Sequence, residues 1–238
     1  MDAPWVYDGF DSKKLSAIWS PKKLVDGALE FQSEIVRSGR GAAKITIHEG
    51  DNFEFGGKNK KKPTERDELF EAQNLWSLEG NPHRYQFSMF LPSDFPIVPT
   101  RLVLAQWKQK EENEGVRVNN PVVALRYGRG SLSVTLQTNE EIQTLYRTHE
   151  EIRGKWLDFE FDTKFDRTGR GFIKGTLNGK QEIDYVGRTA YSDAEGYPFP
   201  GRFYFKMGLY RDKMKEPMSV YIGGYSKWAI PDNSNFPV

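Results

Sequence analysis

The sequence predicts an all-β domain, either a sandwich or a barrel. Short alternating or aromatic-rich runs are separated by turn residues roughly every ten residues, a spacing typical of these architectures. The clearest runs are 42–48, 85–91, 101–108, 122–127, 132–137, 156–163, 171–177, 203–210 and 219–225. Asn178-Gly179 lies between two strand-like segments and predicts a β-hairpin. Helix signals are few, with a turn or two expected at 72–78 and at 139–145.

The chain length fits one domain of this kind. It has 238 residues, shows no internal repeat or low-complexity linker, and is expected to fold as a single domain over residues 1–238. Aromatic side chains make up 14% of the chain, against 37% hydrophobic residues in total. Such rings either fill a β core or stack against flat ligands such as sugars.

Charge and cysteine content exclude several functions. The net charge of +1 gives no overall field that would attract nucleic acid or a membrane surface. The absence of cysteine excludes disulfides, thiolate zinc sites and cysteine nucleophiles. No apolar stretch is long enough to cross a membrane. The start of the chain shows no signal sequence, so either the protein is not exported or a signal peptide has been removed before residue 1. We expect the second, on the function argued below, and a monomer that is secreted or periplasmic.

The run 202–210 carries two very different faces. Side chains alternate along a strand, so Phe203, Phe205, Met207 and Leu209 share an apolar face that must look into the core. The opposite face carries Arg202, Tyr204, Lys206, Gly208 and Tyr210. Two tyrosines, a lysine and an arginine are unusual on an ordinary solvated strand, and Gly208 leaves room for a ligand beside the backbone.

Two further segments show comparable pairs. Gln106 and Lys108 project from one face of 101–108, roughly 7 Å apart. Arg66 and Glu68 also share a face, where Glu68 can hold the guanidinium group.

Together these residue types suit one reaction, the cleavage of a 4-linked uronic acid by β-elimination. The C5 carboxylate must be neutralised, the C5 proton removed and the leaving O4 protonated. Arg, Gln and Lys supply the first by charge and hydrogen bonds. A tyrosine whose phenolate is stabilised by nearby Lys and Arg can act as base and acid.

Ordered motifs resemble known polysaccharide lyases. The segment 204–210, Tyr-Phe-Lys-Met-Gly-Leu-Tyr, is similar to the Tyr-Phe-Lys-Ala-Gly-x-Tyr signature of jelly-roll alginate lyases. Segment 66–69, Arg-Asp-Glu-Leu, resembles their Arg-Ser/Thr-Glu-Leu strand, and 106–108 lies where they carry Gln-Ile/Val-His. The wider frame, from about residue 7 to 225, resembles the heparin lyase I and glucuronan lyase group, notably at 90–96, 154–159 and 177–180.

The resemblance implies a β-jelly roll whose concave sheet binds an anionic polysaccharide. It implies Tyr210 as base and acid, with Arg66, Gln106 and Lys206 on the substrate carboxylate. The residues then expected to contact the rest of the substrate are Lys108, Tyr204, Arg202, Glu68 and Arg211. The missing Gln-Ile/Val-His motif favours a glucuronate-containing polymer over alginate.

One departure from the pattern concerns the family histidine, which is replaced by Lys108. His48 is our candidate to take its place, and Lys108 itself is the alternative. No cofactor is expected to be required. A structural calcium ion held by Asp8, Asp11 and Asp51 is a further possibility that the resemblance raises, without support from EF-hand spacing.

Two other functions compete with elimination. A retaining glycoside hydrolase needs paired carboxylates, and Asp158, Glu160 and Asp162 do share a strand face. A carbohydrate-binding module without catalysis would use the same fold. An unsaturated product separates the lyase from both alternatives.

Overall fold

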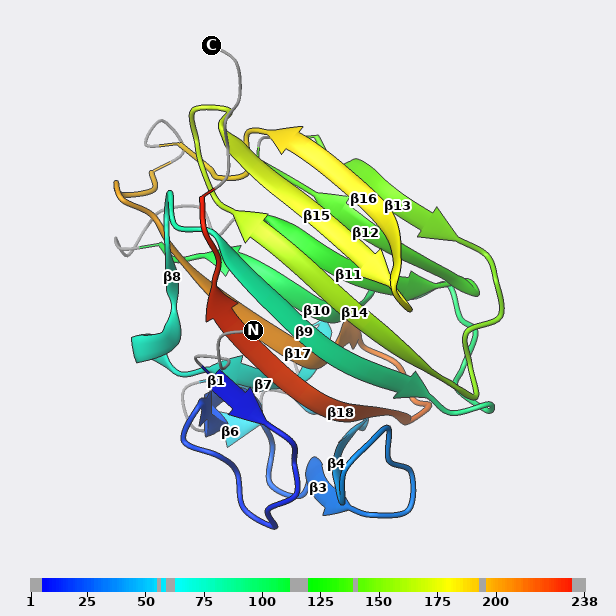
Figure 1. Cartoon of the computed structure of the whole chain (residues 1–238). Helices are drawn as coiled ribbons and strands as arrows, with labels where there is room; N and C mark the ends of the chain where they lie inside the picture. Colours follow the sequence, from blue (N-terminus) through cyan, green and yellow to red (C-terminus); the bar gives the residue numbers. More distant parts are fainter. Residues whose placement is uncertain are drawn as a thin grey trace.

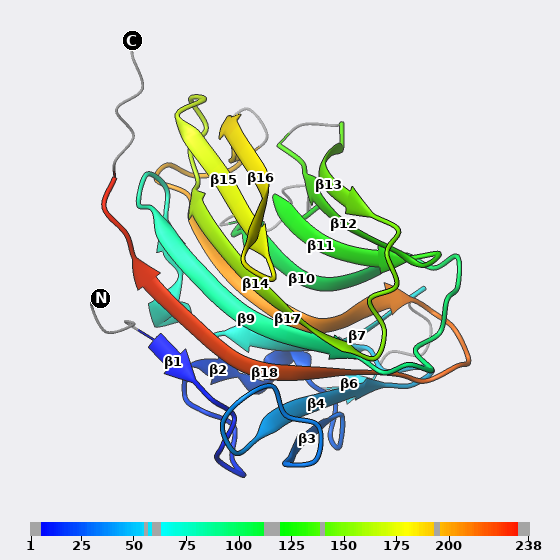
Figure 2. The ribbon, with the colours of Figure 1, turned by 45° about the vertical axis from the view of Figure 1, so that its right-hand side comes forward.

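The computed structural model describes residues 6–54, 57–58, 63–111, 120–138, 141–192 and 196–232. Two curved antiparallel sheets pack face to face (Figures 1 and 2), as predicted for a β-sandwich. These residues form no α-helix, only the 3-10 turns η1 (Pro21–Lys23) and η2 (Gln73–Leu75). No helix in the described ranges is long and apolar enough to cross a membrane.

Sheet A forms one layer, with β14, β9 and β18 at its centre. In spatial order its strands are β16 (Lys180–Gly187), β15 (Gly171–Leu177), β14 (Lys155–Lys164), β9 (His83–Leu91), β18 (Met218–Ala229), β4 (Ala42–Ile47) and β3 (Leu29–Gln32), with β1 (Val6–Asp8) also paired to β18.

Sheet B forms the other layer and carries the strand with the two contrasting faces. Its order is β13 (Gln143–Thr148), β12 (Ser131–Leu136), β11 (Val123–Gly128), β10 (Leu102–Gln109), β17 (Arg202–Asp212), β7 (Thr64–Glu71) and β2 (Trp19–Ser20), with β8 (Ser77–Leu78) also paired to β17. A separate small ladder joins β5 (Phe53–Glu54) to β6 (Gly57–Lys58).

The strand predictions hold, and one helix prediction does not. Each run expected to be extended lies in a strand, apart from one end residue in four of the runs. Asn178 and Gly179, with φ of 51° and 78°, form the predicted hairpin turn between β15 and β16. The helical turn expected in 72–78 is η2. The prediction at 139–145 is wrong, because β13 begins at Gln143 and pairs with β12; residues 139–140 lie outside the described part.

The core lies between the sheets and follows from alternation. In β9 the odd-numbered side chains are buried and the even-numbered ones are partly exposed. From sheet B, Phe205 meets Tyr85 and Phe87 of β9, with ring centroids 5.5 and 5.4 Å apart. The apolar face of β17 therefore looks into the core, as predicted.

A β-bulge interrupts this alternation where β10 meets its neighbours. The register shifts between Val103 and Ala105, so that Val103 lies opposite Tyr210 of β17 and Arg126 of β11. Val103 thus does not share a face with Ala105, contrary to strict alternation. On β17 the backbone of Gly208 has φ of 141°, and a Cβ there would lie 2.5 Å from the carbonyl oxygen of Asp67. Glycine is required by this close approach of β7, rather than by an opening for a ligand.

A buried ion pair joins the sheets. Lys227 of β18 donates to Glu71 Oε1 of β7 at 2.8 Å, and both side chains have no exposed surface. Glu71 also accepts from the Tyr225 hydroxyl at 3.1 Å. Burial raises the pKa of Glu71 and lowers the pKa of Lys227, so each charge depends on the other.

Lys227→Met is expected to lower the free energy of unfolding by about 3–5 kcal/mol, because it leaves Glu71 buried without its cation. The double variant Lys227→Met/Glu71→Gln removes both charges and should recover part of that loss. Denaturant-induced unfolding measures both values. Equal losses in the single and double variants would contradict this account of the pair.

Candidate active site

The face of sheet B turned away from the core, here called the polar face, gathers most of the predicted site residues. Cross-strand pairing aligns Gln106 with Lys206, Gly208 with Glu68 and Tyr210 with Arg66. Paired residues point to the same side of a sheet, so β7, β10 and β17 bring these side chains together.

Glu68 is the centre of this group. It is 1% exposed and accepts hydrogen bonds from Lys206 Nζ at 3.0 Å and from Gln106 Nε2. Its Oε2 also lies 3.1 Å from Nε of Arg66. One buried carboxylate therefore fixes the three side chains expected to handle a substrate carboxylate.

The electrostatics leave this group positively charged. Burial alone would raise the pKa of Glu68, but Lys206 and Arg66 together bring it below its usual value. Burial, with Arg66 nearby, lowers the pKa of Lys206 to about 7 even though Glu68 opposes the shift. Two cations thus share one anion, and Lys206 is the cation that loses its proton more easily.

Tyr210 lies beside this group and is partly exposed. The guanidinium carbon of Arg66 is 4.2 Å from the centre of its ring, and that of Arg101 is 5.3 Å away. The phenol is neither packed in the interior nor far from Arg66. Both guanidinium groups therefore make cation–π contacts with the Tyr210 ring.

An aromatic cluster lies further along the polar face. Tyr204 contacts Phe70 and Trp76, with ring centroids 5.1 and 5.0 Å apart, and Arg202 lies over Trp76 at 5.7 Å. All four side chains are partly exposed. Partly exposed rings of this kind offer stacking surfaces for sugar rings.

Gln106, Lys206 and Lys108 are less accessible than expected. Gln106 and Lys206 are each only 2% exposed, so they form the floor of the polar face. Lys108 binds Glu111 at 2.7 Å, and its side chain is 13% exposed. Burial lowers the pKa of Lys108, although Glu111 opposes that shift.

His48 is not part of a strand of the polar face. It follows β4 of sheet A, on a turn where its backbone N–H donates to Asp51 at 2.8 Å. Its side chain is 61% exposed, with Nδ1 3.4 Å from the Asp51 carboxylate. The carbonyl of Asp51 accepts from the backbone N–H of Arg66, so this turn is joined to the start of β7.

Arg211 was expected to bind the substrate, but its side chain is buried and cannot reach one. It points to the core side of β17, has 0% exposure and binds the buried Glu65 at 2.8 Å. Alternation explains the correction, because Arg211 directly follows Tyr210 and so faces the other way. Its guanidinium group also donates to the carbonyls of Met214 and Glu216, which fixes the turn after β17.

Three residues of the polar face were missed. Phe70 shares its face with Arg66 and Glu68, so the same alternation would have identified it. Trp76 reaches the site from the turn after η2, which strand periodicity does not predict. Arg101 precedes β10, and its contact with Tyr210 depends on the β-bulge.

The carboxylates considered for calcium and for hydrolysis have other partners. Asp8 accepts from Trp19 Nε1 at 2.9 Å, and Asp11 from the backbone of Arg40 at 2.8 Å. Within the described ranges, no three His, Cys, Asp or Glu side chains form a group that could hold a metal.

The three carboxylates considered for a hydrolase also form ion pairs with arginines. Asp158 pairs with Arg37 at 2.6 Å, and Asp162 with Arg84 at 2.5 Å. Glu160 lies 3.3 Å from Arg84. These carboxylates are on sheet A, not on the polar face, and each has a guanidinium partner.

Glu68→Gln is expected to destabilise the protein increasingly as the pH falls from 7 to 5. Without the carboxylate, the pKa of folded Lys206 drops below about 7, whereas the unfolded lysine stays protonated, so the unfolded state binds more protons in this window. The gap in unfolding free energy from wild type should widen by up to about 1.4 kcal/mol per pH unit. Denaturation at several pH values measures it. Glu30→Gln, a change at an exposed carboxylate, serves as control. A difference in unfolding free energy from wild type that stays constant between pH 7 and 5 would refute the claim that Glu68 keeps Lys206 protonated.

Comparison with known proteins places this geometry in context. A fungal endo-β-1,4-glucuronan lyase from Trichoderma reesei has a similar structure, with a TM-score of 0.73, 16% identity and 96% of each chain covered. An alginate lyase from Corynebacterium sp. gives 0.57 and 15% identity over 87% of this chain and 82% of the other. A GH131 β-glucanase catalytic domain from Podospora anserina gives 0.59 and 12% over 97% and 86%.

These likenesses establish the jelly-roll fold, and lyases and a glucanase share it, so the fold alone does not fix the reaction. No curated protein is a significant sequence match. A family model described as polysaccharide lyase, however, matches residues 7–226. Since that match spans nearly the whole chain, this protein belongs to the polysaccharide lyase family.

Proposed function

We propose that this protein cleaves a 4-linked polysaccharide containing uronic acid, with glucuronate favoured, by β-elimination at the polar face. The observation that carries the proposal is the position of Tyr210. Its partly exposed ring lies against Arg66, beside the Glu68 group, in a chain of the polysaccharide lyase family.

In the proposed reaction, Arg66 binds the C5 carboxylate of the substrate, since its side chain is 27% exposed and Glu68 fixes its orientation. Lys206 and Gln106 lie beneath and add positive charge and a fixed dipole that stabilise the enolate-like state. The aromatic cluster around Tyr204 stacks against neighbouring sugar rings.

Tyr210 performs both proton transfers. Its phenolate oxygen takes the C5 proton, and the electrons of that C–H bond form the C4–C5 double bond. The C4–O4 bond breaks, and the departing O4 takes the proton from Tyr210, which restores the phenolate. The products are a shortened chain and an unsaturated uronosyl end, so no water or redox partner is consumed.

The substrate preference follows from motifs and from fold likeness. The Gln-Ile/Val-His motif of the alginate lyases is absent, because Lys108 stands at the histidine position. Among the solved structures compared, the glucuronan lyase has the higher TM-score, 0.73 against 0.57 for the alginate lyase from Corynebacterium sp.. Both points favour a glucuronate-containing polymer.

Tyr210→Phe is expected to abolish cleavage while leaving glycan binding within a few-fold of wild type, because it removes only the hydroxyl that moves the proton. Ultraviolet absorbance of the conjugated double bond measures cleavage, and calorimetry measures binding. Tyr7→Phe, a change at a 65% exposed tyrosine on sheet A, is the matched control.

A Tyr210→Phe variant that still forms unsaturated product would refute this role. Binding without cleavage by the wild type, across a panel of uronides, would identify a binding module instead. Reducing ends without the new absorbance would identify a hydrolase. His48→Asn, measured in parallel, tests the histidine on the turn after β4, which should be dispensable if Tyr210 alone moves both protons.

We further propose that catalysis needs no metal ion, because arginine, lysine and glutamine side chains provide the carboxylate neutralisation. Activity should remain unchanged after dialysis against a chelator. The thermal midpoint, measured with and without added calcium, tests separately for a structural ion near Asp8, Asp11 and Asp51. Loss of activity on chelation that calcium restores would contradict the proposal.

A further inference from the structure

A basic pocket opens at one end of sheet B, and the proposed reaction does not use it. Its volume is about 300 Å³, at the lower end of the range for ligand sites. Strands β10 to β13 and the residues next to their ends supply Arg101, Arg126, Arg129, Arg147 and His149 to its wall. None of the residues that line it is acidic.

Most of these charges lack a carboxylate partner. Arg101 pairs with Asp212 at 2.7 Å, in a contact that is about half exposed. Arg126 donates to the Thr135 hydroxyl at 3.0 Å. Within the described ranges, no carboxylate pairs with Arg126, Arg129 or Arg147. The pocket therefore holds a clear excess of positive charge.

The arginines also act on one another. Burial, and next the nearby charge of Arg101, lower the pKa of Arg126 below that of an ordinary arginine. The guanidinium group stays charged, so this repulsion persists. An anion placed among these groups would relieve the repulsion and gain charge-assisted hydrogen bonds.

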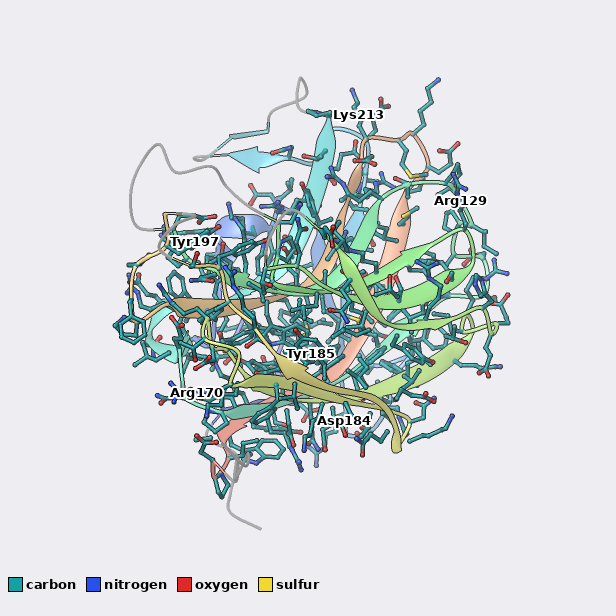
Figure 3. All side chains as sticks on the ribbon, turned by 90° about the horizontal axis from the view of Figure 1, so that it is seen from above. Arg129, Arg170, Asp184, Tyr185, Tyr197 and Lys213 are labelled. Atoms are coloured by element: carbon teal, nitrogen blue, oxygen red, sulfur yellow. The ribbon has the colours of Figure 1, made fainter. Side chains whose placement is uncertain are left out.

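The pocket adjoins the proposed cleavage site through Arg101. Arg101 lines it and also lies 5.3 Å from the centre of the Tyr210 ring. Arg126 lines it too, and it pairs with Val103, which in turn pairs with Tyr210. Figure 3 shows Arg129, on the turn between β11 and β12, at the margin of the molecule opposite Tyr197. The pocket thus lies between Arg101, which contacts Tyr210, and β13 at the edge of sheet B.

We propose that this pocket binds the carboxylate of a second uronic acid residue in the same substrate chain. The inference rests on the proposed function and narrows the class of polymer that the protein would cleave. The cleaved residue places its carboxylate on Arg66, and a neighbouring residue places its own among Arg126, Arg129 and Arg147. Polymers with uronic acids on successive residues are then preferred over those in which uronic acids alternate with neutral sugars.

The double variant Arg129→Gln/Arg147→Gln tests the pocket without touching Arg66 or Tyr210. On a homopolymer of uronic acid, KM should rise about tenfold or more with kcat nearly unchanged, because ground-state and transition-state binding are lost equally. On a polymer of alternating uronic acid and neutral sugar, KM should change little. Arg40→Gln is the control for net charge, because it removes an exposed arginine side chain just before β4 of sheet A.

The same double change in a Tyr210→Phe background allows binding to be measured without turnover. A homo-oligomer of uronic acid should bind about tenfold more weakly by calorimetry when both arginines are replaced. Unchanged KM and unchanged binding in the double variants would overturn the pocket assignment while leaving the elimination proposal intact. Binding that depends on Arg129 and Arg147, in a wild type that cleaves no uronide, would uphold the pocket and overturn the elimination. A protein that binds no oligouronate would overturn both.

Discussion

The alternation of side chains along β17 is the constraint on which both the core and the candidate site depend. Phe205 and its odd-numbered neighbours close the space between the sheets, and Tyr204, Lys206 and Tyr210 form the opposite face. A slip of one residue in its pairing with β7 would exchange these faces, burying Lys206 and Tyr210 in the apolar layer. The hydrophobic core therefore fixes the register, and the register places Tyr210 opposite Arg66.

Glu68 holds the side chains that this register brings together. An enclosed carboxylate is stable only when its oxygens are paired, and here Arg66, Lys206 and Gln106 provide the partners. The same contacts immobilise three flexible side chains before any ligand arrives. Positive charge held in this way needs little rearrangement as negative charge develops on a bound carboxylate.

How much of this was predictable depends on where alternation holds. It predicted the strands, the core face of β17 and the pairing of Arg66 with Glu68 on one face of a strand. The grouping of Arg66, Gln106 and Lys206 was predicted from the resemblance to polysaccharide lyases, because alternation relates only residues of the same strand. Alternation did not predict the contact of Arg101 with Tyr210, since the bulge at Val103 has no clear mark in the sequence. Arg211 was misassigned by motif likeness, although its parity already placed it on the core side. The enclosure of Gln106 and Lys206 depends on side chains from other strands, which a single sequence does not locate.

The near-zero net charge hides a separation of charge between the two faces of the sandwich. On sheet A the outward carboxylates Asp158, Glu160 and Asp162 are each matched by a guanidinium group. On sheet B, Glu68 is shared by two cations, and Arg126 has no carboxylate partner in the described ranges. Salt screens charges beyond about 8 Å at physiological ionic strength, so a polyanion near sheet B responds to these local cations rather than to the charge of the whole chain. A protein with a net charge of +1 can therefore present a strongly basic surface to an acidic polysaccharide.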